Sequence, residues 1–255
     1  MRRQLSALVL AATLAASCSA KNPLPATEPA TQEQLDPGKV LAEQLRSSQP
    51  NENSEIRGVL KIYAGKTHRE IPVVCQVVIE GATWKTIYQT SPTPQTGAEK
   101  LVIIHSANGP NKYLYAHAPT PAAPLPELKP LHAKEILASF AGSDFSIADL
   151  GLDFLHWPQQ RRLPGELRLG QDCYLLESSD PPAPEIVRVK SWIDKESGGL
   201  LVAEAFDRTH HEVKEFNLSG SSFKKVNGKY LLEQMKISRP KNNSHTILKF
   251  DLPKQ

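Results

Sequence analysis

The chain has 255 residues, of which 30 are Lys or Arg and 27 are Asp or Glu, so the formal net charge is +3. These charges are mixed along the sequence and form no basic stripe, which argues against a nucleic-acid-binding surface, and we expect no nucleic-acid partner. Proline is abundant at 21 residues beside 14 glycines, a mix that favours many turns and a β-rich domain.

The first residues are typical of an export signal. Two arginines near the start precede an apolar run over residues 5–16, and this pattern is that of a secretory signal. The run is too short to cross a bilayer, which needs about 20 apolar residues. The sequence Leu14-Ala15-Ala16-Ser17-Cys18 resembles the bacterial lipobox, with Ala15 where leucine is preferred. We predict a lipoprotein signal over residues 1–17 and a lipid anchor at Cys18; a cleaved signal with a stray cysteine is the alternative.

A flexible tether is expected over residues 18–36, because several prolines stand there among small and polar residues. Ser19 follows the anchor, where enterobacterial lipoproteins kept at the inner membrane carry aspartate. This resemblance indicates attachment through Cys18 to the outer membrane, on the periplasmic face of the cell envelope. The rest, residues 37–255, has the length of one domain with a sizeable core.

A helix and a run of strands are predicted for the first half of this domain. Asp36-Pro37 is a typical helix start, and an apolar stripe at helical spacing extends the prediction to residue 47. Strands with short links, an antiparallel meander, are expected at 59–63, 71–79, 83–89, 101–105 and 113–117. Five prolines between residues 118 and 130 predict an irregular crossing segment, because proline cannot donate to a sheet.

Two short helices are predicted midway along the chain. The first covers about 131–141 and places Ile136, Leu137 and Phe140 on one side. The second starts at the capping box Ser146-Ile147-Ala148-Asp149 and turns Leu150 and Phe154 to one face before a proline ends it.

The C-terminal part returns to strands, expected at 172–177, 185–194, 199–206, 211–218, 222–226, 229–238 and 245–251. Val189 and Ile193 alternate with charged neighbours, as Met235 does with Gln234 and Lys236, so one face is apolar and the other polar. The predicted fold is mainly β (α+β). It is a strongly curved antiparallel sheet, or half-barrel, of about 11–12 strands, with the short helices covering its concave face.

Two cysteines remain after the anchor, and both fall in predicted strands. Cys75 and Cys173 have apolar neighbours, so they could pack as small buried hydrophobes. An oxidising periplasm also allows a disulfide between them. The sequence does not show whether their Cα atoms lie within bridging distance, so both alternatives stay open.

The order of elements, together with the lipobox, resembles the LolA/LolB-like fold of outer-membrane lipoprotein-sorting proteins, in its LolA-like branch. Residues 145–150 (FSIADL), 152–158 (LDFLHWP), 170–177 (GQDCYLLE) and 187–194 (VRVKSWID) carry the resemblance, which spans 38–253. It implies a helical lid over an apolar cavity that takes lipid or lipoprotein acyl chains. The candidates for this cavity, with ordinary core packing as the alternative, are Ile136, Leu137, Phe140, Leu150, Phe154, Val189, Ile193 and Met235.

The sequence carries none of the common motifs of covalent or metal-assisted catalysis. It has no Gly-x-Ser-x-Gly elbow, His-Glu-x-x-His zinc motif or phosphate-binding glycine loop. Neighbouring histidines such as His210 and His211 point to opposite faces of a strand and chelate poorly. We therefore expect no catalytic residues, no metal and no cofactor. Two functions stay open: a membrane-anchored carrier or acceptor of acyl chains in lipoprotein sorting, and an envelope-stress sensor or adaptor that binds a periplasmic protein partner.

Overall fold

The computed structural model describes residues 36–106, 109–132, 134–181, 185–218, 222–226 and 229–252. The predicted signal, the anchor at Cys18 and the tether up to residue 35 lie outside these ranges. None of the helices in the described part of the chain has the length and apolar content that a membrane crossing requires.

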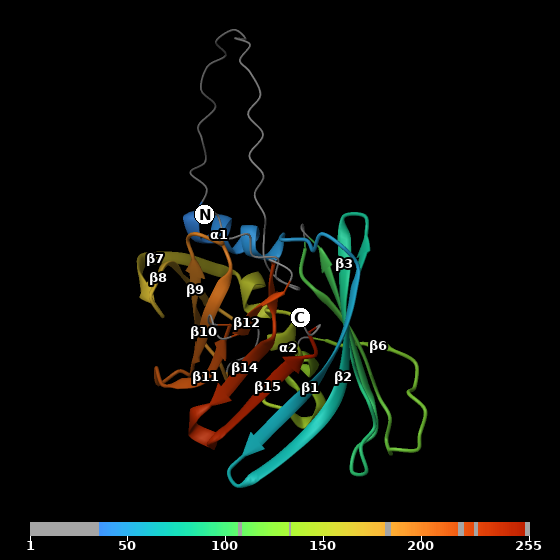
Figure 1. The fold of residues 1–255 in the computed structure, drawn as a ribbon. Coiled ribbons are helices and arrows are strands. Elements are labelled where there is room, and N and C mark those ends of the chain that lie inside the picture. Colours follow the sequence, from blue (N-terminus) through green and yellow to red (C-terminus); the bar gives the residue numbers. More distant parts are fainter. Residues whose placement is uncertain are drawn as a thin grey trace.

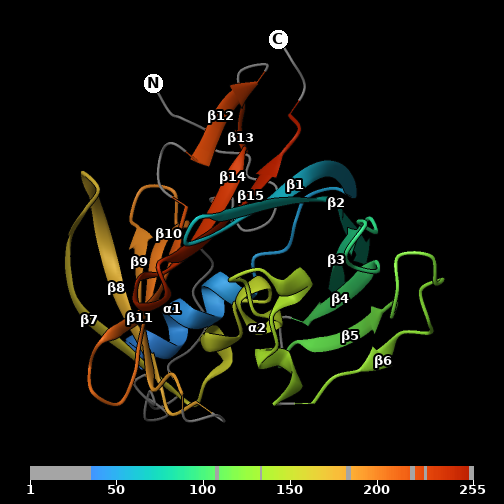
Figure 2. The same ribbon diagram turned by 90° about the horizontal axis from the view of Figure 1, so that it is seen from below.

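Thirteen strands form one antiparallel sheet that curves around the helices, as Figure 1 and Figure 2 show. Their order across the sheet is β6-β5-β4-β3-β2-β1-β15-β14-β11-β10-β9-β8-β7. Their bounds are β1 Ser54–Ala64, β2 Thr67–Glu80, β3 Thr83–Thr90, β4 Glu99–Ser106, β5 Lys112–His117, β6 Lys129–Pro130, β7 Gln159–Arg168, β8 Gln171–Ser179, β9 Arg188–Asp194, β10 Leu200–Phe206, β11 Glu212–Asn217, β14 Gln234–Arg239 and β15 Ser244–Phe250. A separate hairpin is formed by β12 (Phe223–Val226) and β13 (Lys229–Leu232).

The two ends of the domain meet in the middle of the large sheet. β1 pairs with β2 on one side and with the last strand, β15, on the other. Gly58 permits this closure, because a Cβ at its position would lie 2.4 Å from the carbonyl oxygen of Lys249 on β15. From this seam the meander β1–β6 extends in one direction and β14, β11 and β10–β7 extend in the other. The central seam is therefore a long-range pairing, while most other strand neighbours follow one another along the chain.

The core lies on the inner face of the curve, because buried and exposed residues alternate along the strands. On β2, for example, Ile71, Val73, Cys75 and Val77 are buried and their neighbours are not. The helix α1 (Pro37–Arg46) lies inside the curve in Figure 2 and buries Leu41 and Leu45 there. It begins as predicted, with the carboxylate of Asp36 accepting the Gly38 N–H at 2.9 Å.

Residues 135–157, which we call the lid, also lie inside the curve. They form four short turns: η1 (Glu135–Leu137), η2 (Phe140–Gly142), α2 (Ile147–Leu150) and η3 (Asp153–His156). The single helix predicted over 131–141 is wrong, because Ser139 is extended and Ala141 has a left-handed φ of 54°. The predicted capping box is confirmed: Ser146 accepts the Asp149 N–H at 3.2 Å, and the Asp149 carboxylate accepts the Ser146 N–H at 2.7 Å.

Two strand predictions also need correction. The sequence-based reading missed β7, whose outer half is polar and whose register shifts between Leu163 and Glu166, around a Pro-Gly pair. The strand predicted over 229–238 is two strands, β13 and β14, which pair with different neighbours. The architecture itself, a strongly curved antiparallel sheet with short helices against its concave face, is confirmed, with thirteen strands in the large sheet instead of 11–12.

Cys75 and Cys173 are both free and buried. In the sheet order, β1, β15, β14, β11, β10 and β9 lie between β2, which carries Cys75, and β8, which carries Cys173. At about 4.8 Å per strand this separation is roughly 30 Å along the sheet, whereas a disulfide needs Cα atoms within about 7 Å. Cys173 also faces outward, with Leu175, Trp192 and Val202, while Cys75 belongs to the inner core. The structure therefore contains two buried free thiols and no disulfide between Cys75 and Cys173.

Candidate functional site

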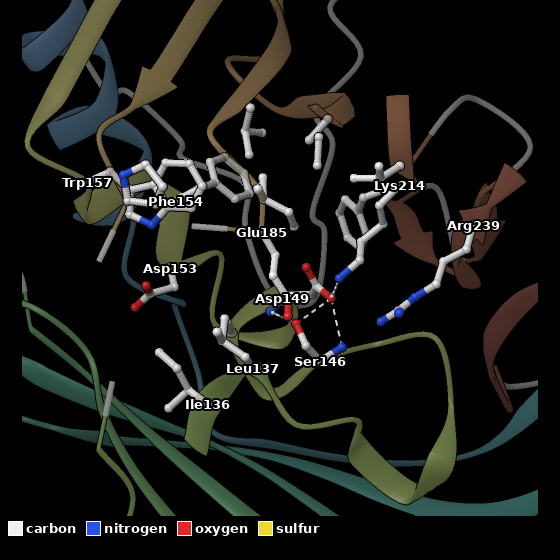
Figure 3. Close-up of a pocket in the computed structure, with 18 residues that line it drawn as sticks. Ile136, Leu137, Ser146, Asp149, Asp153, Phe154, Trp157, Glu185, Lys214 and Arg239 are labelled. Atoms are coloured by element: carbon white, nitrogen blue, oxygen red, sulfur yellow. Dashed lines mark hydrogen bonds and ion pairs between the residues drawn. The ribbon is translucent and has the colours of Figure 1, made fainter. Parts of the chain in front are cut away.

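A cavity of about 270 Å³ lies between the lid and the inner face of β9, β10 and β11 (Figure 3). This volume is close to the lower end of the roughly 300–1,000 Å³ that small-molecule sites occupy. The small side chains of Ala203 and Ala205 on β10 leave this room. The apolar residues that line the cavity are Ile136, Leu137, Ala148, Phe154, Trp157, Pro181, Ile186, Val189, Ala203, Ala205, Val213 and Phe216.

The cavity brings together half of the residues that the sequence nominated. Ile136, Leu137, Phe154 and Val189 line it. Leu137 is 41% exposed although it lines the cavity, so it also presents apolar surface to solvent. The other four nominated residues are buried in the core and are not among the lining residues: Phe140, Leu150, Ile193 and Met235.

One end of the cavity carries an ion pair between the sheet and the lid. Lys214 Nζ on β11 lies 2.6 Å from the Asp149 carboxylate on α2, and the lysine side chain is only 9% exposed. Lys214 points inward because it alternates with Phe216 and pairs with Ala205. The register then shifts, so that Phe206 pairs with Glu212 and Val213 is an extra residue. Both Val213 and Lys214 thus reach the cavity.

Sequence reasoning missed Lys214, although a signal was present. In the predicted strand 211–218, simple alternation places Lys214 on the same face as Phe216, which is the apolar face. A lysine on an apolar face needs a partner or a function. The sequence does identify Asp149, but only as the cap of its helix.

A second cation, Arg239 on β14, lines the same end. Its Nη2 donates to the Asp144 carbonyl oxygen at 3.3 Å, and its Nε lies 3.7 Å from the Asp144 carboxylate. The Nε is buried and finds no hydrogen-bond partner among the described residues. Asp144 in turn accepts hydrogen bonds from Ser244 Oγ at 2.7 Å and Thr246 Oγ1 at 2.8 Å, which fixes the lid to β15.

A buried polar network attaches the C-terminal part of the lid, at Gly151 and Asp153, to the strands β3, β4 and β5. His105 is joined to Thr86 at 3.0 Å and to Asn111 at 3.1 Å, and Asn111 donates to the Gly151 carbonyl at 2.7 Å. Tyr113 donates to the Asp153 carboxylate at 3.1 Å. Burial raises the pKa of Asp153 and of Tyr113, and it lowers the pKa of His105 to about 4. His105 is therefore neutral at physiological pH.

This network makes stability depend on pH. Because the pKa of His105 is about 4 in the folded state and 6.5 ordinarily, the unfolded chain binds more protons between these values. Stability should fall as the pH drops from 6.5 to 4, with His105 contributing roughly 2–3 kcal/mol of the loss at about 1.4 kcal/mol per pKa unit. Urea unfolding at pH 7 and at pH 4.5 measures this loss in the free energy of unfolding.

The comparison with His105→Gln isolates the contribution of this histidine from those of the carboxyl groups and of His156, whose pKa burial also lowers to about 4. We expect a smaller loss of stability on acidification in the variant than in the parent chain. Equal losses in the two chains would contradict the assignment of a neutral, buried His105.

Across the described ranges, no three His, Cys, Asp or Glu side chains converge as metal ligands would. The two cations at the cavity are instead each paired with a carboxylate, Lys214 with Asp149 and Arg239 with Asp144. The arrangement is that of an apolar hollow with a polar end, which can hold a ligand that is itself apolar along most of its length.

The chain is similar to other proteins over most of its fold. A family model described as that of an uncharacterized protein matches residues 81–254, and no curated protein matches the chain. A DUF1329 family protein from Desulfovibrio piger is 20% identical with a TM-score of 0.65, covering 85% of this chain and 92% of that one. A domain described as an outer-membrane lipoprotein-sorting protein, from Vibrio parahaemolyticus, is 16% identical with a TM-score of 0.67, covering 84% and 90%.

A LolA superfamily protein from Nitrosomonas europaea is also similar, at 15% identity and a TM-score of 0.53, with 85% of this chain and 94% of that one covered. At these identities the likeness to the solved structures concerns the fold.

Proposed function

This chain belongs to the family whose model matches residues 81–254, which has a LolA-like fold, and on that premise we propose that it binds an acyl chain of a lipid or lipoprotein. The acyl chain occupies the cavity beneath the lid. The protein acts in the sorting of lipoproteins to the outer membrane, as a binding protein and not as an enzyme.

One observation carries this proposal: the inner curve of the sheet is not completely filled where the lid covers β9–β11. An acyl chain exposed to water costs about 0.8 kcal/mol per methylene, so a carrier needs a dry, concave apolar surface. The cavity of about 270 Å³ provides one, with aromatic and aliphatic side chains on the lid side and two alanines on the sheet side. The exposed Leu137 adds apolar surface at the rim.

We further propose that the protein works on the periplasmic face of the outer membrane, anchored through Cys18 and linked to the domain of residues 37–255 by the tether of residues 18–36. Several acyl chains on one cysteine, each methylene contributing about 0.8 kcal/mol, would make the attachment effectively permanent. A sensor that binds a protein partner needs no internal hollow, so the cavity favours the lipid-binding function over that alternative.

Native mass spectrometry of the whole chain carrying Cys18→Ser, which cannot be acylated, tests the proposal. The protein is purified from the periplasm without detergent. We expect a population whose mass exceeds that of the polypeptide by one lipid or acylated peptide, released by mild activation. A single species with the bare polypeptide mass, which also fails to take up added palmitate, would contradict the proposal.

A further inference from the structure

We infer that the ligand is a single-chain amphiphile with an anionic head group, bound by Lys214 and Arg239 at the polar end of the cavity. This inference rests on the proposed function and specifies its ligand. The shared chemistry is a carboxylate or phosphate on one acyl chain, as in a fatty acid or a lysophospholipid.

The first argument is the surplus of hydrogen-bond donors at this end. An ammonium has three donors and a guanidinium has five. Lys214 Nζ has one carboxylate partner, Asp149. Arg239 reaches only one carbonyl oxygen within hydrogen-bond distance, and its buried Nε is unpartnered among the described residues. Buried donors are normally satisfied. A ligand that places acceptor oxygens here would accept hydrogen bonds from the remaining donors of Lys214 and Arg239.

The second argument is that the nearby acceptors are already occupied. Asp149 Oδ2 accepts from Ser146 N at 2.7 Å, Ser146 Oγ at 2.6 Å and Lys214 Nζ at 2.6 Å. Asp144 accepts from Ser244 and Thr246 as well as facing Arg239. Since these carboxylates keep their other partners, Lys214 and Arg239 can each share a charge with the ligand without leaving an acid unpaired. Figure 3 shows both cationic side chains reaching toward the corner formed by Ser146 and Asp149.

Two further acids, Asp153 and Glu185, line the cavity. Asp153 lies beside Phe154 and Trp157 in Figure 3, where it accepts from Tyr113. Glu185 belongs to an exposed part of the chain just before β9. The apolar walls continue from the polar end toward Phe154 and Trp157, so the geometry orients a ligand with its head at Lys214 and its tail along the lid.

The third argument is size. The volume of about 270 Å³ lies just below the range of about 300–1,000 Å³ for drug-sized ligands. Such a space takes one acyl chain, so any further chain of the same ligand would lie outside it. A single chain with a charged head therefore matches both the volume and the polar end.

The test compares palmitate, methyl palmitate and palmitoyl lysophosphatidic acid in competition against a fluorescent fatty acid, with the whole Cys18→Ser chain at pH 7. We expect palmitate or the lysophosphatidic acid to bind at least about tenfold more tightly than methyl palmitate, because a charge-assisted hydrogen bond is lost in the ester. The stronger of the two anions identifies a carboxylate or a phosphate head group. Equal binding of acid and ester would overturn this inference and leave the proposed function intact, whereas no binding of any of the three would overturn both.

Variants assign the effect to residues. Lys214→Gln and Arg239→Gln should each weaken palmitate binding by about tenfold and leave methyl palmitate unchanged. Lys241→Gln is the matched control, since this lysine is half exposed and pairs with Asp207 away from the cavity lining. If Lys214→Gln does not fold, the Arg239→Gln variant alone tests whether the cations bind the head group. An unchanged preference for the acid over the ester in the folded variants would overturn the assignment.

Discussion

Replacing Ala203 by phenylalanine is expected to weaken acyl-chain binding by about a hundredfold while leaving the fold in place. Ala203 is 4% exposed on β10 and forms the sheet side of the cavity. A phenyl ring there occupies the space of several methylenes. Displacing three or four of them, at about 0.8 kcal/mol each, weakens binding by roughly a hundredfold.

The measurement is the affinity for palmitate by displacement of a fluorescent fatty acid, together with the thermal unfolding midpoint. Leu201→Phe is the control, because Leu201 lies on the same strand but packs against the outer cluster of Trp192 and Val202. It adds bulk outside the cavity, so binding should stay at the level of the parent chain. Undiminished binding in a folded Ala203→Phe variant would show that the acyl chain lies elsewhere.

Of the substitutions proposed for this protein, Phe145→Ala is expected to cause the largest loss of stability, about 3–5 kcal/mol in the free energy of unfolding. Phe145 is fully buried in the lid and meets the ring of Phe216 edge-on, with centroids 6.2 Å apart. It thus attaches the lid to the sheet directly beside the cavity. Truncation leaves a void that the rigid strands cannot fill.

Urea unfolding of the two chains measures this loss. Phe206→Ala is a suitable control, since Phe206 is half-buried on β10 and is covered on its ring by Arg188 at 4.8 Å. We expect it to cost clearly less than Phe145→Ala. Comparable losses in both variants would mean that the lid packs no more tightly than the outer surface.

The sequence was most informative where structure is decided locally. The cap of α1 at Asp36 and the capping box at Ser146 were predicted because each depends on residues within one helical turn. The meander β1–β5 was predicted because its strands alternate in polarity and follow one another with short links. The resemblance to the LolA-like branch is confirmed by the fold.

Features that depend on residues far apart in the sequence could not be predicted from local patterns. The pairing of β1 with β15 joins the two ends of the domain, and nothing local to either strand specifies it. The polar stretch of β7 becomes a strand only because it pairs with β8. The predicted helix over 131–141 is interrupted at the extended Ser139 and at Ala141, whose φ is 54° and whose N–H is accepted by Glu99 on β4.

The residues of the candidate site were likewise predicted only in part. Four of the eight nominated residues line the cavity, because an apolar pattern identifies the inner face but cannot tell a filled core from a hollow. Alternation places Lys214 on the inner face, but it does not show the register shift between β10 and β11 that brings Val213 to the cavity beside it. The second cation, Arg239, comes from a strand far along the chain, so its approach to the lid could not be predicted.

Photolabelling with palmitate that carries a diazirine at the end of its chain tests the central claim most directly, since it locates the bound acyl chain. With the whole Cys18→Ser chain we expect labelled peptides from the lid, residues 135–157, and from β9–β11. Labelling should disappear when unlabelled palmitate is in excess. Labels confined to the outer face of the sheet, or spread evenly over the surface, would contradict an acyl chain beneath the lid.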